Sequence, residues 1–293
     1  MKRIVTANPD ALLSFSGYTK STPTHILMNN KSIGEMFDVV EYIVESNPSS
    51  LQMKDQYDQT PLHVACANGY ITARTVKFLL IVWVGALYEL NTCRASPIHL
   101  LCEKNEWGEE IDDEVAIGVL KLLLQVQPDL VSQINDFEDN EQIPLHLAAD
   151  NKSKAFCKVL VDAYPESVKI RGSGDGCLPF HHACNNGRLE TVEYLFGLYP
   201  ECIHIRDNWG HLPIHEAMNL PGEGENAIDI IKFLLKHDPE CVSKPTTGEY
   251  ISWPLHLLCN NFDKSNVTEL LFDIYPEAIL LRNDREHNYP LMF

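Results

Sequence analysis

A short motif built around Pro-X-His recurs through this chain. Seven copies are TPTH, TPLH, SPIH, IPLH, LPFH, LPIH and WPLH, and an eighth, YPLM, lacks the histidine. From Pro23 to Pro290, successive motif prolines are separated by 38, 36, 47, 35, 34, 41 and 36 residues. A period of about 35 residues indicates that one supersecondary unit is repeated many times. We therefore expect the 293 residues to form one repeat array rather than two globular domains.

The motif predicts the start of a short helix. Proline suits the first helical position because its missing N–H has no partner there and its fixed φ already fits a helix. Thr22, Thr60 and Ser96 directly precede motif prolines and are typical N-caps. We expect about ten helical residues, ended by glycine turns such as Asn68-Gly69, since glycine tolerates the left-handed conformation that stops a helix.

A second helix is predicted by a second series of prolines. Two apolar residues stand five and four positions before each of these prolines, as at Leu160-Val161 and Leu195-Phe196. Such a two-residue-wide apolar stripe is typical of a helix buried along one side. The series consists of Pro9, Pro48, Pro128, Pro165, Pro200, Pro239 and Pro276.

Between the second proline and the next motif lie turn-forming sequences such as Asp207-Asn-Trp-Gly210, which predict projecting, hairpin-like fingers. The order helix, turn, helix, finger, together with TPLHVACANG at 60–69, resembles the ankyrin repeat family. Most second helices run on to Tyr-Pro-Glu or a variant, as at Tyr164-Pro165, which resembles a longer-repeat variant of that family.

The resemblance implies an all-α fold, an ankyrin-type solenoid of stacked helix-turn-helix pairs with projecting fingers. We expect a single array over residues 1–293, with a partial first repeat at 1–20, about six to seven repeats over 21–288 and a truncated last repeat at 289–293. It also implies a protein–protein interaction module or scaffold that binds a partner through the fingers and the concave first-helix face. The resemblance implies neither a cofactor nor catalysis.

A structural role is the alternative interpretation. The sequence begins inside a repeat and stops as a new first helix should begin, without an obvious polar cap at either end. It would then be a segment of a longer repeat protein, or an array that associates end to end through apolar residues such as Ile4, Val5, Leu291 and Phe293.

Charge and cysteine usage narrow the partners and the compartment. The formal net charge of −18, from 41 acidic and 23 basic residues, repels phosphate backbones and anionic lipids, so we expect neither nucleic acid nor a membrane surface as partner. The longest apolar run, 78–88, is too short to span a bilayer. The nine cysteines include no CxxC pair, which favours reduced thiols and an intracellular, cytoplasmic location.

The histidines do not indicate an active site. Seven of the twelve are the motif histidine, and the family resemblance implies that this imidazole bonds helix to finger. The doublet His181-His182 does not predict a metal site because neighbours on a helix point in different directions. The glycine-rich string 171–176 lacks the GK[ST] ending and preceding strand of a phosphate loop. We expect no catalytic, metal or cofactor-binding residue.

An enlarged repeat supplies the first candidate binding residues. The insertion at 107–114 begins with Trp107 and carries five acids, and the next finger adds Glu138 and Asp139 beside Phe137. The functional interpretation is an acidic patch with aromatic anchors for a basic segment of a protein partner. The alternative is a solvated, charge-rich loop.

Aromatic residues at the fingertips form the second candidate set. Tyr57, Trp209 and Tyr250 each stand four residues before a motif proline. Large aromatics on projecting turns can anchor a partner at low entropic cost. They can equally pack on the adjacent finger.

Overall fold

A computed structural model describes residues 13–14, 19–104, 111–137, 140–186, 188–218, 225–247, 251–261 and 276. These residues fall into two compact units. Unit 1 comprises the described residues of 1–144 and 158–164, and unit 2 those of 145–157 and 165–293. Helices α8 (Pro144–Asn151) and α9 (Lys154–Ala163) contribute residues to both.

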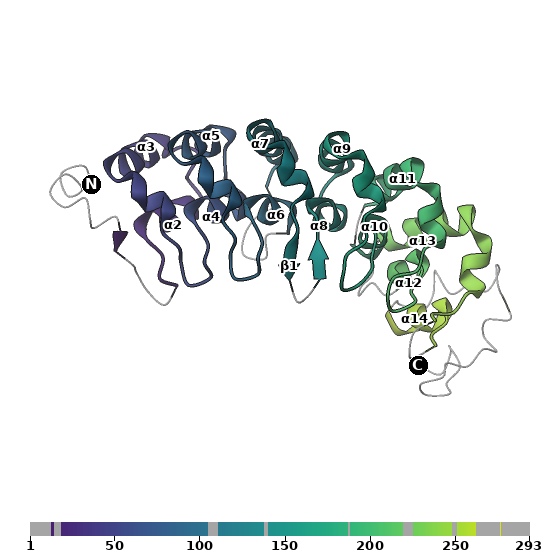
Figure 1. Ribbon diagram of the computed structural model, residues 1–293. Coiled ribbons are helices and arrows are strands. Elements are labelled where there is room, and N and C mark those ends of the chain that lie inside the picture. Colours follow the sequence, from purple (N-terminus) through teal and green to yellow (C-terminus); the bar gives the residue numbers. More distant parts are fainter. Residues whose placement is uncertain are drawn as a thin grey trace. The chain divides into compact units, whose positions relative to one another are not determined.

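Unit 1 contains three helix pairs, each followed by a short 3₁₀ helix. First helices α2, α4 and α6 lie side by side in one row, and second helices α3, α5 and α7 lie in another (Figure 1). The elements are α2 (Pro23–Met28), α3 (Phe37–Ser46), η2 (Pro48–Gln52), α4 (Pro61–Ala67), α5 (Ala73–Val82), η3 (Val84–Tyr88), α6 (Pro97–Cys102), α7 (Asp113–Val126) and η4 (Pro128–Ser132), then strands β1 (Asn135–Phe137) and β2 (Asn140–Gln142).

The two strands are antiparallel, with Asn135 opposite Gln142 and Phe137 opposite Asn140, and they form the finger that the sequence predicts before Pro144.

Unit 2 repeats the same order of elements. Helices α10 and α12 pack together, as do α12 and α14, while α11 packs on α13. The elements are η5 (Pro165–Lys169), α10 (Pro179–Asn186), α11 (Leu189–Leu198), η6 (Pro200–His204), α12 (Pro213–Met218), α13 (Glu225–His237), η7 (Pro239–Ser243) and α14 (Pro254–Asn261). The expected all-α repeat architecture is confirmed.

The predicted N-terminal caps are present. Thr22, Thr60 and Ser96 have extended backbones and cap α2, α4 and α6, each with a motif proline at the first helical position. The first helices are shorter than the expected ten residues, however. They have six to eight residues in the described part of the chain, because the next turn follows at once.

The expected glycine stop after α4 is wrong. Asn68 is extended, with φ −84°, and Gly69 is not among the described glycines with positive φ. The Asn68 side chain ends the helix instead. Its Oδ1 accepts the N–H of Tyr70 at 3.0 Å, and its Nδ2 donates to the carbonyl of Met28 in the preceding repeat at 2.6 Å.

The second proline series has a defined structural role. In the described repeats these prolines begin the 3₁₀ helices η2, η4, η5, η6 and η7. The first N–H of a helix has no acceptor within the helix, so a proline at this position costs no hydrogen bond. The residue before η2, Asn47, has φ −151° and ψ 86°, outside the α region that a following proline disfavours. In the one exception Val84 begins η3 after Trp83 adopts the same extended conformation.

The core lies between the two rows of helices within each unit. The apolar pairs of the second helices are buried or nearly so, including Ile43 and Val44 in α3 and Leu234 and Leu235 in α13. The eight cysteines whose side chains are described are free thiols, and all of these except Cys93 are buried, as small core residues should be. Every helix in the described part of the chain is too short or too polar to reach across a bilayer.

Candidate functional site

Three of the described fingers are shaped by an acidic or amide side chain six residues before a motif proline. Asp55 Oδ1 accepts the N–H groups of Tyr57 at 2.8 Å and Gln59 at 2.9 Å. The same two acceptor bonds recur at Asn91 and at Asp207. These bonds replace water as the partner of turn N–H groups and fix the finger backbone.

A left-handed residue completes the turn in five of the described fingers. The residue three positions before the motif proline has positive φ in five described fingers, which turns the chain back toward its helix. These residues are Lys20, Asp58, Arg94, Gly176 and Gly210, with φ of 49°, 56°, 54°, 67° and 83°. In the fingers of Tyr57 and Trp209, this aromatic residue directly precedes the left-handed residue and stands at the fingertip.

The motif histidine connects helix to finger. In His63, Nδ1 accepts the N–H of the N-cap Thr60 at 3.1 Å, so the proton is on Nε2, which donates to the carbonyl of Ala95 in the next finger at 3.2 Å. His25 and His99 in unit 1 and His181 in unit 2 bond in the same way. Burial lowers the pKa of His63 and of His99 to about 4. The structural role implied by the resemblance is confirmed.

Backbone hydrogen bonds also join neighbouring fingers. In unit 1 the N–H of Thr92 donates to the carbonyl of Tyr57 at 2.9 Å. In unit 2 the N–H of Asn208 donates to the carbonyl of Asp175 at 2.7 Å. Within each unit, the fingertips are therefore held in a fixed spacing by their own backbone.

Two of the predicted binding residues lie at these fixed tips. The side chain of Tyr57 in unit 1 is 51% exposed, and that of Trp209 in unit 2 is 56% exposed. The Trp209 ring lies 6.4 Å from the ring of His211, which supports it from one side. Both residues present aromatic surface to solvent.

The remaining predicted residues are only partly placed. Phe137 ends strand β1, at the tip of the hairpin finger, and its side chain lies outside the described residues. Trp107, Glu138, Asp139 and Tyr250 also lie outside the described residues.

Three acids of the enlarged repeat have a local structural role. Asp112 caps α7, and its Oδ1 accepts the N–H of Val115 at 3.2 Å. Asp113 and Glu114 occupy the first turn, where negative charge complements the helix dipole. The start of helix α7 therefore explains these three acids, and no protein partner is needed to explain them.

Unit 2 contains two clusters of potential metal ligands that the sequence analysis missed. Asp175, Cys177 and His182 form the first, and Asp207, His211 and Glu216 form the second. Each joins residues of a finger to a residue of the following helix. Hydrogen bonds to Asp207 and Glu216 raise the pKa of His211 to about 9, whereas burial raises the pKa of the Cys177 thiol and lowers that of His182 to about 4.

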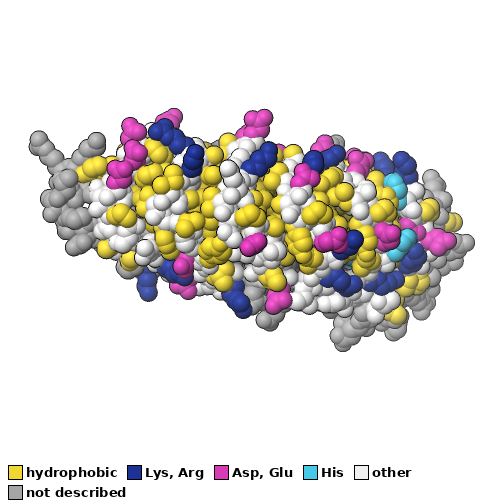
Figure 2. All heavy atoms as spheres, turned by 45° about the horizontal axis from the view of Figure 1, so that its top comes forward, with side chains coloured by type: hydrophobic (Ala, Val, Ile, Leu, Met, Phe, Trp, Pro, Cys, Tyr) yellow, Lys and Arg dark blue, Asp and Glu magenta, His cyan; other side chains and the backbone are white. Residues whose placement is uncertain are grey.

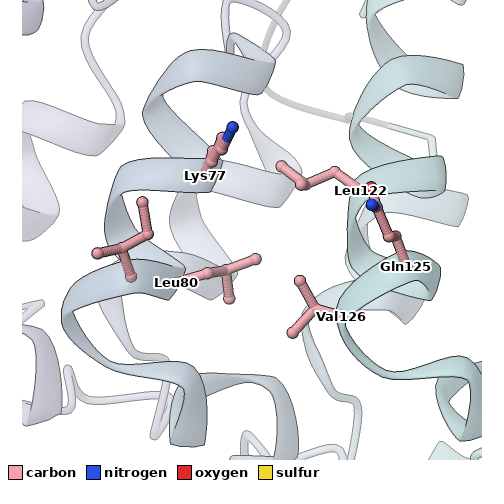
Figure 3. A pocket seen from close by; sticks show the side chains of 6 residues that line it. Lys77, Leu80, Leu122, Gln125 and Val126 are labelled. Atoms are coloured by element: carbon pink, nitrogen blue, oxygen red, sulfur yellow. The ribbon is translucent and has the colours of Figure 1, made fainter.

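An open groove of about 340 Å³ lies between α5 and α7 in unit 1 (Figure 3). Its lining is mostly aliphatic and includes Leu80, Leu122 and Val126, together with Lys77 and Gln125. Hydrophobic side chains lie among charged ones on this second-helix face (Figure 2).

Known proteins of several kinds are similar to this chain. The family described as Ankyrin repeats (3 copies) matches residues 112–207 and 145–245, and the family described as Ankyrin repeat matches residues 57–86. A Saccharomyces cerevisiae protein named Probable 26S proteasome regulatory subunit p28 is 26% identical over 202 residues, which are 68% of this chain and 80% of the relative.

Two solved structures share the fold. The human ASB11 ankyrin repeat domain aligns with a TM-score of 0.61 at 16% identity, over 86% of this chain and 97% of that one. The ankyrin repeat domain of Bcl-3, described as a unique member of the IkappaB protein family, aligns with a TM-score of 0.54 at 18% identity, over 87% and 98%.

Proposed function

Because the chain belongs to the ankyrin repeat family, we propose that it is a protein-interaction module that binds another protein through its fingers and first-helix face, without catalysis. The exposure of aromatic side chains on rigid fingertips carries this proposal. Tyr57 and Trp209 are each more than half exposed although their backbones are fixed by hydrogen bonds.

Rigid fingers favour binding because less freedom is lost on docking. A large aromatic has few rotatable bonds and much surface to bury, so it can dominate an interface. An interface of roughly 1,200–2,000 Å² in total would require several neighbouring fingers. We therefore propose Tyr57 and Trp209 as anchors, together with Phe137 and Tyr250, for which the sequence predicts the same role.

A basic segment of a protein partner suits the charge of this chain. The net charge of −18 attracts cationic surfaces and repels nucleic acid and anionic membranes. Glu138 and Asp139, beside Phe137, and the insertion at Trp107 are the assigned acidic contacts. Rim charges act mainly on the association rate, so binding should weaken as salt concentration rises.

We also propose that the repeats of both units form one array over residues 1–293. We propose further that the array is a long-repeat variant, in which most second helices run on to Tyr-Pro-Glu or a similar sequence. The motif spacing across the boundary between the units, 35 residues from Pro144 to Pro179, matches the spacing elsewhere. The eight cysteines whose side chains are described are free thiols, which suits a reducing, intracellular and cytoplasmic location.

The relative from yeast suggests a specific partner. It is named as a regulatory subunit of the 26S proteasome, and 80% of its length aligns with this chain. We propose a proteasome component as the first partner to test. Co-sedimentation of the purified chain with 26S proteasome would support this partner, and absence of co-sedimentation would remove it.

The general proposal is tested by affinity capture with matched variants. We expect Tyr57→Ala and Trp209→Ala to reduce the amount of captured protein by about tenfold or more, as hot-spot truncations do. The matched control is Tyr88→Ala, because Tyr88 is also 51% exposed but lies in η3 and not on a finger. Equal losses in all three variants, or no loss in the fingertip variants, would contradict the proposed surface.

End-to-end self-association is the second candidate function. Its proposed contacts, Ile4, Val5, Leu291 and Phe293, lie outside the described residues. The molar mass measured by light scattering would distinguish it. A mass that grows with concentration favours self-association, and a constant mass of 33.2 kDa excludes it.

A further inference from the structure

In two repeats of unit 2, a polar residue replaces the aliphatic residue found at the same position of most other repeats. Three residues after the motif proline, most repeats carry an aliphatic side chain, but the two repeats that begin at Pro179 and Pro213 carry His182 and Glu216. The aliphatic residues at this position are Ile26, Val64, Leu100, Leu147 and Leu257. Packing alone therefore does not require a polar residue there.

His182 faces two potential ligands from its own finger. Donor atoms of Asp175, Cys177 and His182 all lie within 4.8 Å of one another. Asp175 and Cys177 are buried, and His182 is half-buried. The Oδ1 of Asp175 accepts the N–H of Cys177 at 2.8 Å, which directs Oδ2 toward His182.

The spacing of these atoms suits a shared ion. Asp175 Oδ2 and His182 Nε2 are 3.6 Å apart, longer than a hydrogen bond. Two ligand atoms bound to zinc at about 2.0–2.1 Å with a tetrahedral angle lie about 3.4 Å apart. A small side-chain movement would therefore let both atoms and Cys177 Sγ reach one ion.

The second cluster has a different geometry. His211 Nδ1 lies 2.9 Å from Glu216 Oε1 and 3.4 Å from Asp207 Oδ2, so a proton on the ring already joins the two carboxylates. A metal ion there would displace the ring proton that joins His211 to both carboxylates. In the first cluster it would displace the thiol proton of Cys177, which points to Asp207 Oδ2 at the longer distance of 4.0 Å. We therefore take the first cluster as the better site.

We propose that Asp175, Cys177 and His182 bind one zinc-class divalent ion, with water as the fourth ligand. One sulfur, one imidazole nitrogen and one carboxylate oxygen are a ligand set that zinc accepts in tetrahedral sites, and the thiolate disfavours Mg²⁺ and Ca²⁺. The ion would fasten the finger at residues 172–177 to helix α10. It would thereby fix the neighbouring finger, which bonds to Asp175 through Asn208.

The test is metal binding by the full chain. The reduced, metal-free protein is titrated with Zn²⁺ against a competing chelator, and then with Co²⁺, whose visible spectrum reports tetrahedral geometry and whose near-ultraviolet absorption reports a thiolate ligand. We expect one ion per chain. Cys177→Ala and His182→Leu should each weaken Zn²⁺ binding by at least about tenfold, since even outer-shell partners contribute about 10–100-fold.

Two control variants make the test specific. Cys93→Ala removes the most accessible described thiol, and Glu216→Leu removes a ligand of the second cluster. Both should retain one ion. His182→Leu introduces the residue found at the same position in other repeats, so circular dichroism should show a folded chain. Retention of the ion by Cys177→Ala or His182→Leu, its loss in either control, or no stoichiometric binding would overturn the proposal.

Discussion

At the scale of single residues, the motif histidine does two tasks at once in four repeats, those of His25, His63, His99 and His181. Its Nδ1 satisfies an N–H at the start of one helix, and its Nε2 satisfies a carbonyl in the next finger, as His63 does between Thr60 and Ala95. Both backbone groups would otherwise be buried without a partner, at a cost of about 1–3 kcal/mol each. Because the ring must be neutral to accept one bond and donate the other, its charge state is linked to folding.

This link predicts a loss of stability in acid. Burial lowers the folded-state pKa of His63 and His99 to about 4, against an ordinary value of 6.5. Between pH 6.5 and pH 4 the unfolded state therefore binds protons that the folded state does not. Each histidine should lower the free energy of unfolding by up to about 1.4 kcal/mol per pH unit as the pH falls through this range, with no contribution above it.

Urea denaturation of wild type and His63→Gln at several pH values would measure this effect. The variant should be less stable at pH 7, because its hydrogen bonds are impaired, but its stability should fall less steeply between pH 6.5 and 4. Identical slopes for the two proteins would show that His63 does not titrate on unfolding.

The left-handed position of each finger gives a second residue-scale prediction. Arg94 has φ 54°, where a Cβ is unfavourable and glycine is not. We expect Arg94→Gly to be more stable than Arg94→Ala by about 1 kcal/mol. The usual order is the reverse, since glycine makes the unfolded chain more flexible. Thermal or urea unfolding of both variants measures this difference in stability. A more stable alanine variant would contradict the left-handed backbone conformation at Arg94.

The sequence predicted the structure correctly at positions that one residue type strongly prefers, such as proline at the start of a helix. It failed at positions that several residue types can occupy. The motif prolines and the caps at Thr22, Thr60 and Ser96 were predicted correctly. The left-handed residues were not identified, because Lys20, Asp58 and Arg94 are not glycines. Gly69 was given the role of a helix stop that the Asn68 side chain performs through bonds to Tyr70 and Met28.

At the scale of elements, the second proline series shows a similar limit. The sequence predicted the end of the second helix, and η2, η4, η5, η6 and η7 do begin at these prolines. The 3₁₀ helices themselves were not predicted, since five residues are too few to show a helical period. Val84 replaces the proline in η3 without loss of the element, so proline favours this turn and is not required for it.

The finger is the element whose rigidity the proposed function needs. Asp55 alone satisfies two of its N–H groups, so Asp55→Ala should destabilise the protein by about 1–3 kcal/mol. Asp55→Asn should cost little, because Asn91 makes the same bonds in the next finger. Unfolding of both variants tests this, with hydrogen exchange at Tyr57 and Gln59 as the local readout. Equal effects of alanine and asparagine would mean that charge, not the acceptor bonds, matters.

At the scale of the whole molecule, the periodicity was sufficient to identify the fold, because each repeat packs mainly on its neighbours. The fingertip aromatics could also be found by their register. The cluster at Asp175, Cys177 and His182 could not, since its ligands come from a finger and a helix and form no contiguous motif. Its only signal was His182 at a position that is aliphatic in most repeats.

The most direct test of the proposed binding surface is site-specific photo-crosslinking in lysate of the source cell. A photoreactive residue is placed at exposed fingertip positions Gln56 and Asn208, and at exposed Lys158 on second helix α9 as the control. We predict a covalent adduct with another protein from the fingertip positions and none from position 158. An adduct formed only from position 158, or none from the fingers of a folded chain, would contradict binding through the fingers.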